Sequence, residues 1–158
     1  LNDDALRRWP VDYYVDLTAR LTANNVKVIV TGGSSDEWVI PYFRGQNVIN
    51  LIGLTSLTDL IAVYRQCSAV VAHDSGPLHL AGLAGVPLVA LFGPTNPHEK
   101  VPRSPEVQIF WGGDNLACRP CYDGKTYARC SKNTCLHAIT PDQVYASLMN
   151  MLEIPHDL

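Results

Sequence analysis

The segment 70–81 constrains this chain most, because an apolar run typical of a β-strand ends there abruptly in a polar turn. Val70–Ala72 is followed by His73 and the turn Asp74–Pro77, and then by small and apolar residues at helical spacing. When a buried parallel strand turns directly into a helix, the unpaired N–H groups of the helix point beyond the carboxyl end of the strand. Ligands of open α/β sheets bind at this end, and the positive helix terminus favours anions, phosphates above all.

The same arrangement recurs one unit later in the sequence. The apolar run Leu88–Phe92 leads into Gly93–Pro97, a second loop with Gly, Pro and a hydroxyl-bearing residue. Two adjacent strand-end loops of this composition predict a site for a phosphate-bearing ligand. The competing interpretation is an ordinary capped turn, because short motifs of this kind often match by chance.

The composition indicates an ordinary globular domain. The chain has 158 residues, 47% hydrophobic and 17% charged, which is enough to bury one core. A net charge of −3 without a cluster of Lys and Arg argues against a nucleic-acid partner. No apolar run approaches the length of a membrane span and no signal peptide is visible. The chain has five cysteines, an odd number for a chain without an export signal, so we expect a reducing, cytoplasmic environment. The chain begins at Leu1 and not at Met, so we expect a fragment or a processed piece.

Strand and helix patterns alternate along the sequence. Apolar spacing predicts helices over 11–23, 56–67, 77–84 and 141–152, a helix from Ser34 or Ser35 through Tyr42, and strands over 26–31, 48–52, 69–72, 88–92 and 107–110. Such alternation with short connections specifies a parallel sheet covered by helices on both faces. We therefore expect one α/β, Rossmann-like domain over residues 1–158, with a cysteine-containing loop at 112–137.

Local signals add detail to these elements. Ser56, followed by Asp59, resembles a capping box, and Thr140 is placed to cap the last helix. Five aromatic side chains are expected to lie in the core and not to form a stacking surface for a ligand: Trp9, Trp38, Tyr42, Phe43 and Trp111.

Each residue type in the first loop has a physical role to play toward an anion. Gly76 removes a Cβ where a diphosphate must approach the backbone, and Pro77 starts the helix without needing an N–H. Ser75 can cap the helix or donate its hydroxyl to a phosphate oxygen. His79 falls in the first helical turn, within reach of the same anion. Asp74 repels a phosphate, so we expect it to bind sugar hydroxyls or to hold N–H groups of its own loop.

The stretch from His73 to Pro97 resembles the signature of the family 9 glycosyltransferases, the ADP-heptose:lipopolysaccharide heptosyltransferases and their relatives. Such a long continuous match is far more specific than a lone glycine motif. Flanking segments agree with it at Arg7–Pro10, at 32–37 and at Gly53–Leu57. The resemblance implies the two-domain GT-B architecture, with this chain as its C-terminal, nucleotide-sugar-binding half.

The resemblance also implies roles for individual residues. Ser75, Gly76, Leu78 and His79 would hold the diphosphate of an ADP-sugar, and Asp74 would contact the donor sugar. Pro77 belongs to the same donor-binding loop. Asp36 or Glu37 would accept hydrogen bonds from the ribose, and backbone groups of Leu54 and Thr55 would meet the adenine. Arg7 stands where the family has a phosphate-binding Lys, a change that keeps the charge but not the geometry. The second strand-end loop adds Gly93 and Thr95 to the predicted donor site.

The resemblance implies inverting transfer of a sugar, heptose being the best-known case, to a lipopolysaccharide-type acceptor, without an obligatory metal. The acceptor site and the general base would belong to an N-terminal half that this chain lacks, so we expect no catalytic residue here and no turnover by the chain alone. We expect at most peripheral membrane association, in the cytoplasm or at the inner face of the inner membrane.

Four of the five cysteines gather in the predicted loop, at Cys118, Cys121, Cys130 and Cys135. Four thiolates at such spacing can hold a structural zinc ion, which would stabilise a loop with little apolar content. The alternative is that they are unliganded or form disulfides, with the loop packed against the sheet edge. Cys67 is expected to be a small buried apolar residue.

Two other functions remain open from the sequence. One is a UDP-sugar epimerase with the GT-B shape, which uses similar loops. The other is a non-catalytic nucleotide-binding module or a zinc-stapled interaction module.

Overall fold

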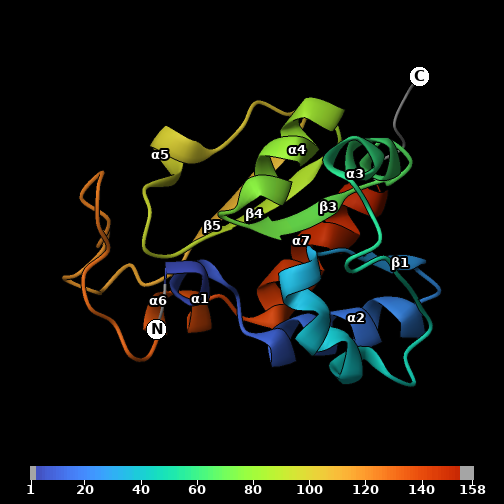
Figure 1. Cartoon of the computed structure of the whole chain (residues 1–158), viewed down its shortest axis with the longest axis horizontal. Helices are drawn as coiled ribbons and strands as arrows, with labels where there is room; N and C mark the ends of the chain where they lie inside the picture. Colours follow the sequence, from blue (N-terminus) through green and yellow to red (C-terminus); the bar gives the residue numbers. More distant parts are fainter. Residues whose placement is uncertain (1–2, 154–158) are drawn as a thin grey trace.

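In the computed structural model, which describes residues 3–153, parallel strands alternate with helices along the chain (Figure 1). The strands are β1 (Val28–Val30), β2 (Val48–Asn50), β3 (Val70–His73), β4 (Leu88–Phe92) and β5 (Val107–Trp111). The helices are α1 (Asp3–Arg7), α2 (Val11–Ala23), the 3₁₀ helix η1 (Ser34–Phe43), α3 (Leu57–Tyr64), α4 (Gly76–Ala84), α5 (Pro97–Lys100), α6 (Thr134–His137) and α7 (Pro141–Glu153). None of the helices in this described part has the length and apolarity that crossing a bilayer requires.

The strands of the described residues form two sheets and not the single sheet expected. One sheet has the order β1-β2 and the other has the order β3-β4-β5, and every pairing within them is parallel. Helices cover both faces: α3 and α4 lie on one side of the larger sheet, and α2 with α7 lie on the other (Figure 1). The α/β class with parallel strands and helices on both faces is therefore confirmed.

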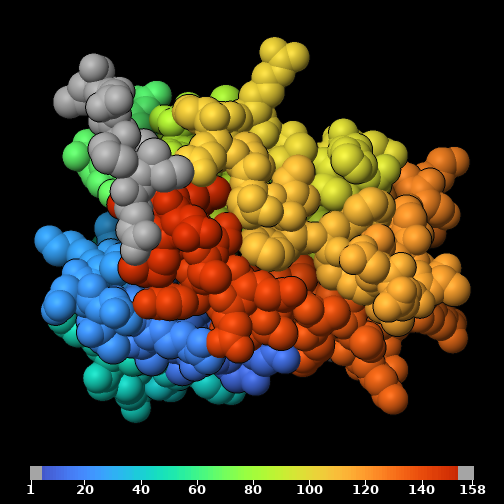
Figure 2. Space-filling view, turned by 180° about the vertical axis from the view of Figure 1, so that it is seen from behind, coloured from blue at the N-terminus to red at the C-terminus, as the bar shows by residue number. Residues whose placement is uncertain are grey.

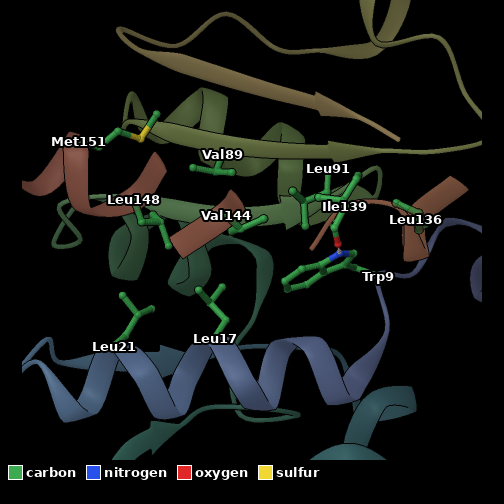
Figure 3. Close-up of a cluster of buried hydrophobic side chains, with 10 residues drawn as sticks. All are labelled: Trp9, Leu17, Leu21, Val89, Leu91, Leu136, Ile139, Val144, Leu148 and Met151. Atoms are coloured by element: carbon green, nitrogen blue, oxygen red, sulfur yellow. Dashed lines mark hydrogen bonds between the residues drawn. The ribbon is translucent and has the colours of Figure 1, made fainter. Parts of the chain in front are cut away.

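Strand β4 is the centre of the core, since all five of its residues are buried. Val89 and Leu91 belong to one hydrophobic cluster, which α2, α6 and α7 complete (Figure 3). Leu88, Ala90 and Phe92 belong to a second cluster, which β3, α3 and α4 complete. A strand with apolar side chains on both faces fits only between two layers of helices.

The first cluster is closed by the packing of α2 against α7, with Trp9 at one end of it. The Trp9 indole is fully buried, and its Nε1–H donates a hydrogen bond of 2.9 Å to the Ile139 carbonyl (Figure 3). Figure 2 shows α7 in red, lying between α2 in blue and the segment around β5 in yellow. The expectation that Trp9 belongs to the core is confirmed.

Two of the predicted helix caps form as expected. The Ser56 Oγ accepts from the Asp59 N–H while the Asp59 carboxylate accepts from the Ser56 N–H. The carboxylate also accepts from the Ser56 hydroxyl at 2.6 Å, and this bond, followed by that from the Ser56 N–H, lowers the pKa of Asp59. Thr140 caps α7 in the same reciprocal way with Gln143. The predicted serine cap after β1 is wrong, because Gly33 is the N-cap of η1 and no side chain caps it.

The 34–43 segment departs most from its prediction. It forms a 3₁₀ helix and not an α-helix, and Trp38 and Tyr42 are about half exposed while Phe43 is buried. A 3₁₀ helix has three residues per turn, so side chains four apart no longer share one face. The predicted core position is therefore right for Phe43 and wrong for Trp38 and Tyr42, while Trp111 is partly buried.

Helix α4 offers a test of the two-sided core, because it carries a buried and an exposed leucine. We expect Leu78→Ala to lower the free energy of unfolding by about 2–5 kcal/mol, since the side chain is fully buried against the sheet. Leu83 lies on the same helix and is 69% exposed, so Leu83→Ala should change stability by less than about 0.5 kcal/mol. Urea unfolding measures both, and equal losses would contradict the assignment of α4's buried face.

Candidate functional site

The predicted ligand loops all leave strands at their carboxyl ends. Because the strands within each sheet run parallel, the loops after β1 and β2 share one edge, and so do those after β3 and β4. A cavity of about 640 Å³ reaches from the interior to this end of the molecule. Five of the predicted donor residues line it: Arg7, Asp36, Asp74, Ser75 and Pro77.

Asp74 joins the two strand-end loops through its side chain. Its Oδ2 accepts a hydrogen bond of 2.7 Å from the Thr95 hydroxyl, with Asp74 6% exposed and Thr95 1% exposed. From the residues we also expected this carboxylate to hold N–H groups of its own loop. In the structure it accepts instead from the Thr95 hydroxyl, which belongs to the next loop. The predicted sugar contact of Asp74 and the donor contact of Thr95 remain predictions.

Arg7 reaches the same loop from the N-terminal side of the chain. Its Nη1 donates to the Asp74 carbonyl at 3.1 Å, which places a guanidinium beside the turn into α4. A cation at this position adds to the positive helix end, so the two together favour an anion. Arg7 thus lies beside this turn, and its role in binding a phosphate remains a prediction.

The N-terminus of α4 presents backbone amides to this end of the cavity. The first N–H groups of a helix have no partner within it. A Cβ built on Gly76 would meet nothing within 4 Å, so its missing side chain leaves open space in front of the backbone. Ser75 occupies the N-cap position, but its hydroxyl donates to the His73 carbonyl at 3.0 Å and does not cap the helix.

The next residues of α4 separate into a core residue and a surface residue. The Leu78 side chain is fully buried, and its N–H donates to the Ser75 carbonyl, so the structure gives Leu78 a packing role. The His79 side chain is exposed in the first turn, where the sequence places it. Neither residue lines the cavity.

The two acidic candidates after β1 have different surroundings. The Asp36 carboxylate accepts from the Gly33 N–H at 3.0 Å and lies 3.6 Å from the Arg8 guanidinium. The Glu37 carboxylate lies against the turn after β2, where a Cβ on Gly53 would stand 2.7 Å from its Oε1. Glu37 is thus adjacent to Leu54, which is 73% exposed and follows that turn. Asp36 lines the cavity whereas Glu37 is exposed outside it, and which of the two would meet a ribose remains a prediction.

Gly93 plays a different structural part from the one predicted. A Cβ at this position would lie 2.7 Å from the Cys135 Sγ and 2.8 Å from the Leu136 Cγ. Gly93 is buried, and its lack of a side chain lets α6 pack against the end of β4. A donor contact by its backbone remains a prediction.

The cysteine loop extends away from the sheets (Figure 1). All five cysteines lie in the described part of the chain, and none of them forms a disulfide. Burial raises the pKa of Cys121 and of Cys135, and nearby thiols raise both further. Among residues 3–153, no three His, Cys, Asp or Glu side chains are arranged to hold a metal ion, so the structure offers no support for zinc and the zinc site stays a prediction.

Sequence reasoning missed a hydrogen bond from α2 that holds the turn at residues 73–75. The Tyr14 hydroxyl lies 2.9 Å from the His73 Nδ1, and burial raises the pKa of this phenol well above its ordinary value. Tyr14 thus stays protonated and anchors the end of β3 from α2. Its place at helical spacing within 11–23 indicated an inward side chain but carried no signal of this partner.

Comparison with known proteins gives the family. The family model described as glycosyltransferase family 9 (heptosyltransferase) matches residues 3–131. The chain belongs to glycosyltransferase family 9. Lipooligosaccharide heptosyltransferase 2 of Haemophilus influenzae is 34% identical over 111 residues, covering 66% of this chain and 32% of the relative. The protein of the same name from Haemophilus ducreyi is 30% identical over 157 residues, covering 92% of this chain and 44% of the relative.

Solved structures agree with this membership. The E. coli ADP-heptose lps heptosyltransferase II superposes with a TM-score of 0.74 at 27% identity, over 93% of this chain and 42% of that one. A glycosyl transferase family 9 protein from Veillonella parvula gives a TM-score of 0.76 at 26% identity with the same coverage. The chain therefore spans less than half the length of these family members.

The bond between Thr95 and Asp74 can be tested by stability. We expect Thr95→Val to lower the free energy of unfolding by about 1–3 kcal/mol, because it leaves a buried carboxylate oxygen without its donor. Thr95→Ser keeps the hydroxyl and should lose less. Chemical denaturation measures the free energy of unfolding of both variants. Equal losses in the two would show that the Thr95 hydroxyl does not contribute to stability.

Proposed function

We propose that this chain is the donor-binding part of a glycosyltransferase that transfers a sugar, heptose in the first instance, from an ADP-linked donor to a lipopolysaccharide core acceptor. Membership of family 9 and the names of the relatives, which include lipooligosaccharide heptosyltransferases and an ADP-heptose enzyme, support this proposal. The acceptor and the general base would be bound by the part of the protein outside this chain. Such an enzyme would work in the cytoplasm or at the inner face of the inner membrane.

The observation that carries the proposal is the convergence at the N-terminus of α4. The open backbone at Gly76, the Arg7 guanidinium on the same turn and the cavity beside Ser75 favour an anion at one place. Glu37 and the exposed turn at Leu54 stand at the carboxyl ends of β1 and β2, where a nucleoside could lie. A diphosphate with a nucleoside on one side matches this distribution of charge.

The chemistry assigned to this chain is stabilisation of the leaving group. In an inverting transfer the acceptor hydroxyl attacks the anomeric carbon from the face opposite the nucleotide. The bond between that carbon and the phosphate oxygen breaks, and the diphosphate leaves with the electron pair. The helix N–H groups and Arg7 would bind the charge that develops on this oxygen, which lowers the barrier without a metal ion. Asp74 already accepts from Thr95, so we assign it to holding the two loops together and not to taking the proton.

A charge placed at the helix end tests the diphosphate assignment. In the full-length gene product, Ser75→Glu should weaken ADP binding at least about tenfold relative to Ser75→Gln, because only the former sets a carboxylate against the phosphates. Glutamate in a first helical turn is compatible with the helix, so the melting temperature should stay within a few degrees of wild type. Isothermal titration calorimetry gives the affinities.

The same titrations separate the alternatives. ADP binding that is tighter than UDP binding, and that is lost in Gly76→Val, supports the proposed donor. UDP binding as tight as ADP binding favours the epimerase-like alternative. Equal ADP affinities of the Glu and Gln variants, or no nucleotide binding, would contradict the phosphate site.

A further inference from the structure

The cysteine loop, residues 112–137, returns to the candidate site at Asn133, the N-cap residue of α6. Asn133 is 6% exposed, and its backbone is left-handed with a φ of 50°. Its side-chain amide donates to the Ala5 carbonyl at 3.3 Å and to the Arg8 carbonyl at 3.0 Å. Figure 1 shows α6 beside α1, the helix that ends at Arg7. Asn133 thus holds a segment that lies 125 to 128 residues away in sequence.

The residue type at position 133 suits this contact. The last carbonyl groups of a helix have no partner within it. Ala5 lies in the last turn of α1 and Arg8 follows the helix directly, so Asn133 supplies donors to carbonyls at this helix end. An asparagine carries two N–H bonds on one nitrogen, and it adopts a left-handed backbone more readily than most residues. The side chain therefore fixes the backbone on both sides of Arg7.

Arg7 and Arg8, the two residues in this fixed segment, extend to different walls of the cavity. Arg7 donates to the Asp74 carbonyl at 3.1 Å, in the loop after β3. The Arg8 guanidinium lies 3.6 Å from the Asp36 carboxylate, which follows β1, and its Cζ is 5.2 Å from the centroid of the Trp38 ring. Both arginines line the cavity. A ligand between the two loops therefore meets a guanidinium on each side.

Arg8 is oriented without using up its hydrogen-bond donors. The separation of 3.6 Å from Asp36 is longer than a hydrogen bond. The Trp38 ring attracts the guanidinium through its face, which leaves the five N–H donors at the edge of the group. A guanidinium that is already oriented loses less conformational entropy when it binds an anion.

We propose that Asn133 is a positioning residue that orients Arg7 and Arg8 toward an anion with two charged groups. The identification of this anion as a diphosphate rests on the proposed function, to which the inference adds Arg8 as a binding residue. Arginine binds two phosphate oxygens at once only when its planar group has the right direction. Without the Asn133 amide, the segment after α1 no longer fixes that direction for either arginine.

Pyrophosphate, which is a diphosphate without a nucleoside, is the probe for the first experiment. In the full-length protein, Asn133→Gly should weaken pyrophosphate binding at least about tenfold in calorimetry, because glycine keeps the left-handed backbone and removes only the amide. The matched control is Asn25, which is exposed and also left-handed, with a φ of 59°. Asn25→Gly should leave the affinity unchanged.

Two outcomes of this titration would overturn the proposal. One is an equal pyrophosphate affinity of the wild type and Asn133→Gly, and the other is no pyrophosphate binding by the wild type. If Ser75→Glu still weakens ADP binding in either case, the proposed function stands while this inference fails. A preference for a nucleotide other than ADP would contradict the proposed donor and would not affect this inference.

A double-mutant cycle separates positioning from general support of the fold. Arg8→Gln changes a partly exposed side chain and should by itself weaken pyrophosphate binding at least about fivefold. In a chain with both Arg7→Gln and Arg8→Gln, Asn133→Gly should add less than about a twofold loss, because the groups that it orients are gone. An undiminished effect of Asn133→Gly in that chain would overturn the proposal. An unchanged affinity of Arg8→Gln would overturn it too, even if Asn133→Gly does not fold.

Nuclear magnetic resonance of the ligand-free protein reports the orientation of Arg8 directly. The Trp38 ring shifts the Arg8 Nε–H resonance, and Trp38→Leu gives the position of that resonance without the ring. Asn133→Gly should move the resonance toward the position in Trp38→Leu, whereas Asn25→Gly should not move it. A resonance that stays at its wild-type position in Asn133→Gly would overturn the proposal, whatever the affinity of that variant for pyrophosphate.

Discussion

The burial of β4 on both of its faces is the constraint on which the rest of this structure depends. Val89 and Leu91 require one helical layer, and Leu88, Ala90 and Phe92 require another. A strand with two apolar faces can pair only with neighbours that are covered in the same way, which favours parallel strands linked by helices. Parallel order then sends the polar loops after β3 and β4 to one edge. The position of the candidate site therefore follows from the composition of the core.

That edge is held together by contacts that reach it from distant parts of the chain. Thr95 donates to Asp74 from the loop after β4, and Arg7 donates to the Asp74 backbone. Tyr14 bonds His73 from α2. The turn into α4 is thus fixed from three directions before any ligand arrives. A preorganised arrangement of this kind spends little free energy on reorganisation when charge develops on a leaving group.

The sequence predicted what depends on local pattern and missed what depends on tertiary partners. Leu88–Phe92 and Val11–Ala23 were predicted to the residue, because an uninterrupted apolar run and an amphipathic period leave little choice. Trp38 was misplaced because its spacing does not reveal that the segment winds as a 3₁₀ helix. The Asp74–Thr95 bond joins residues 21 apart in sequence, and no periodicity links them. The loop motif predicted an anion site, but only the structure shows that the Asp74 carboxylate faces inward.

The separation of β1 from β3 also has a physical origin in the sequence. β1 is three residues long and its side chains are only partly buried, whereas β4 is completely buried. A central strand of a sheet covered on both faces is normally buried throughout, as β4 is. The partial burial of β1 is instead typical of an end strand, which is its position in the β1-β2 sheet. The cavity beside it joins the candidate site at Asp36 and Ser75. Asp36 and Ser75, from the loops after β1 and β3, therefore line one cavity although no strand pairing within the described residues joins their two sheets.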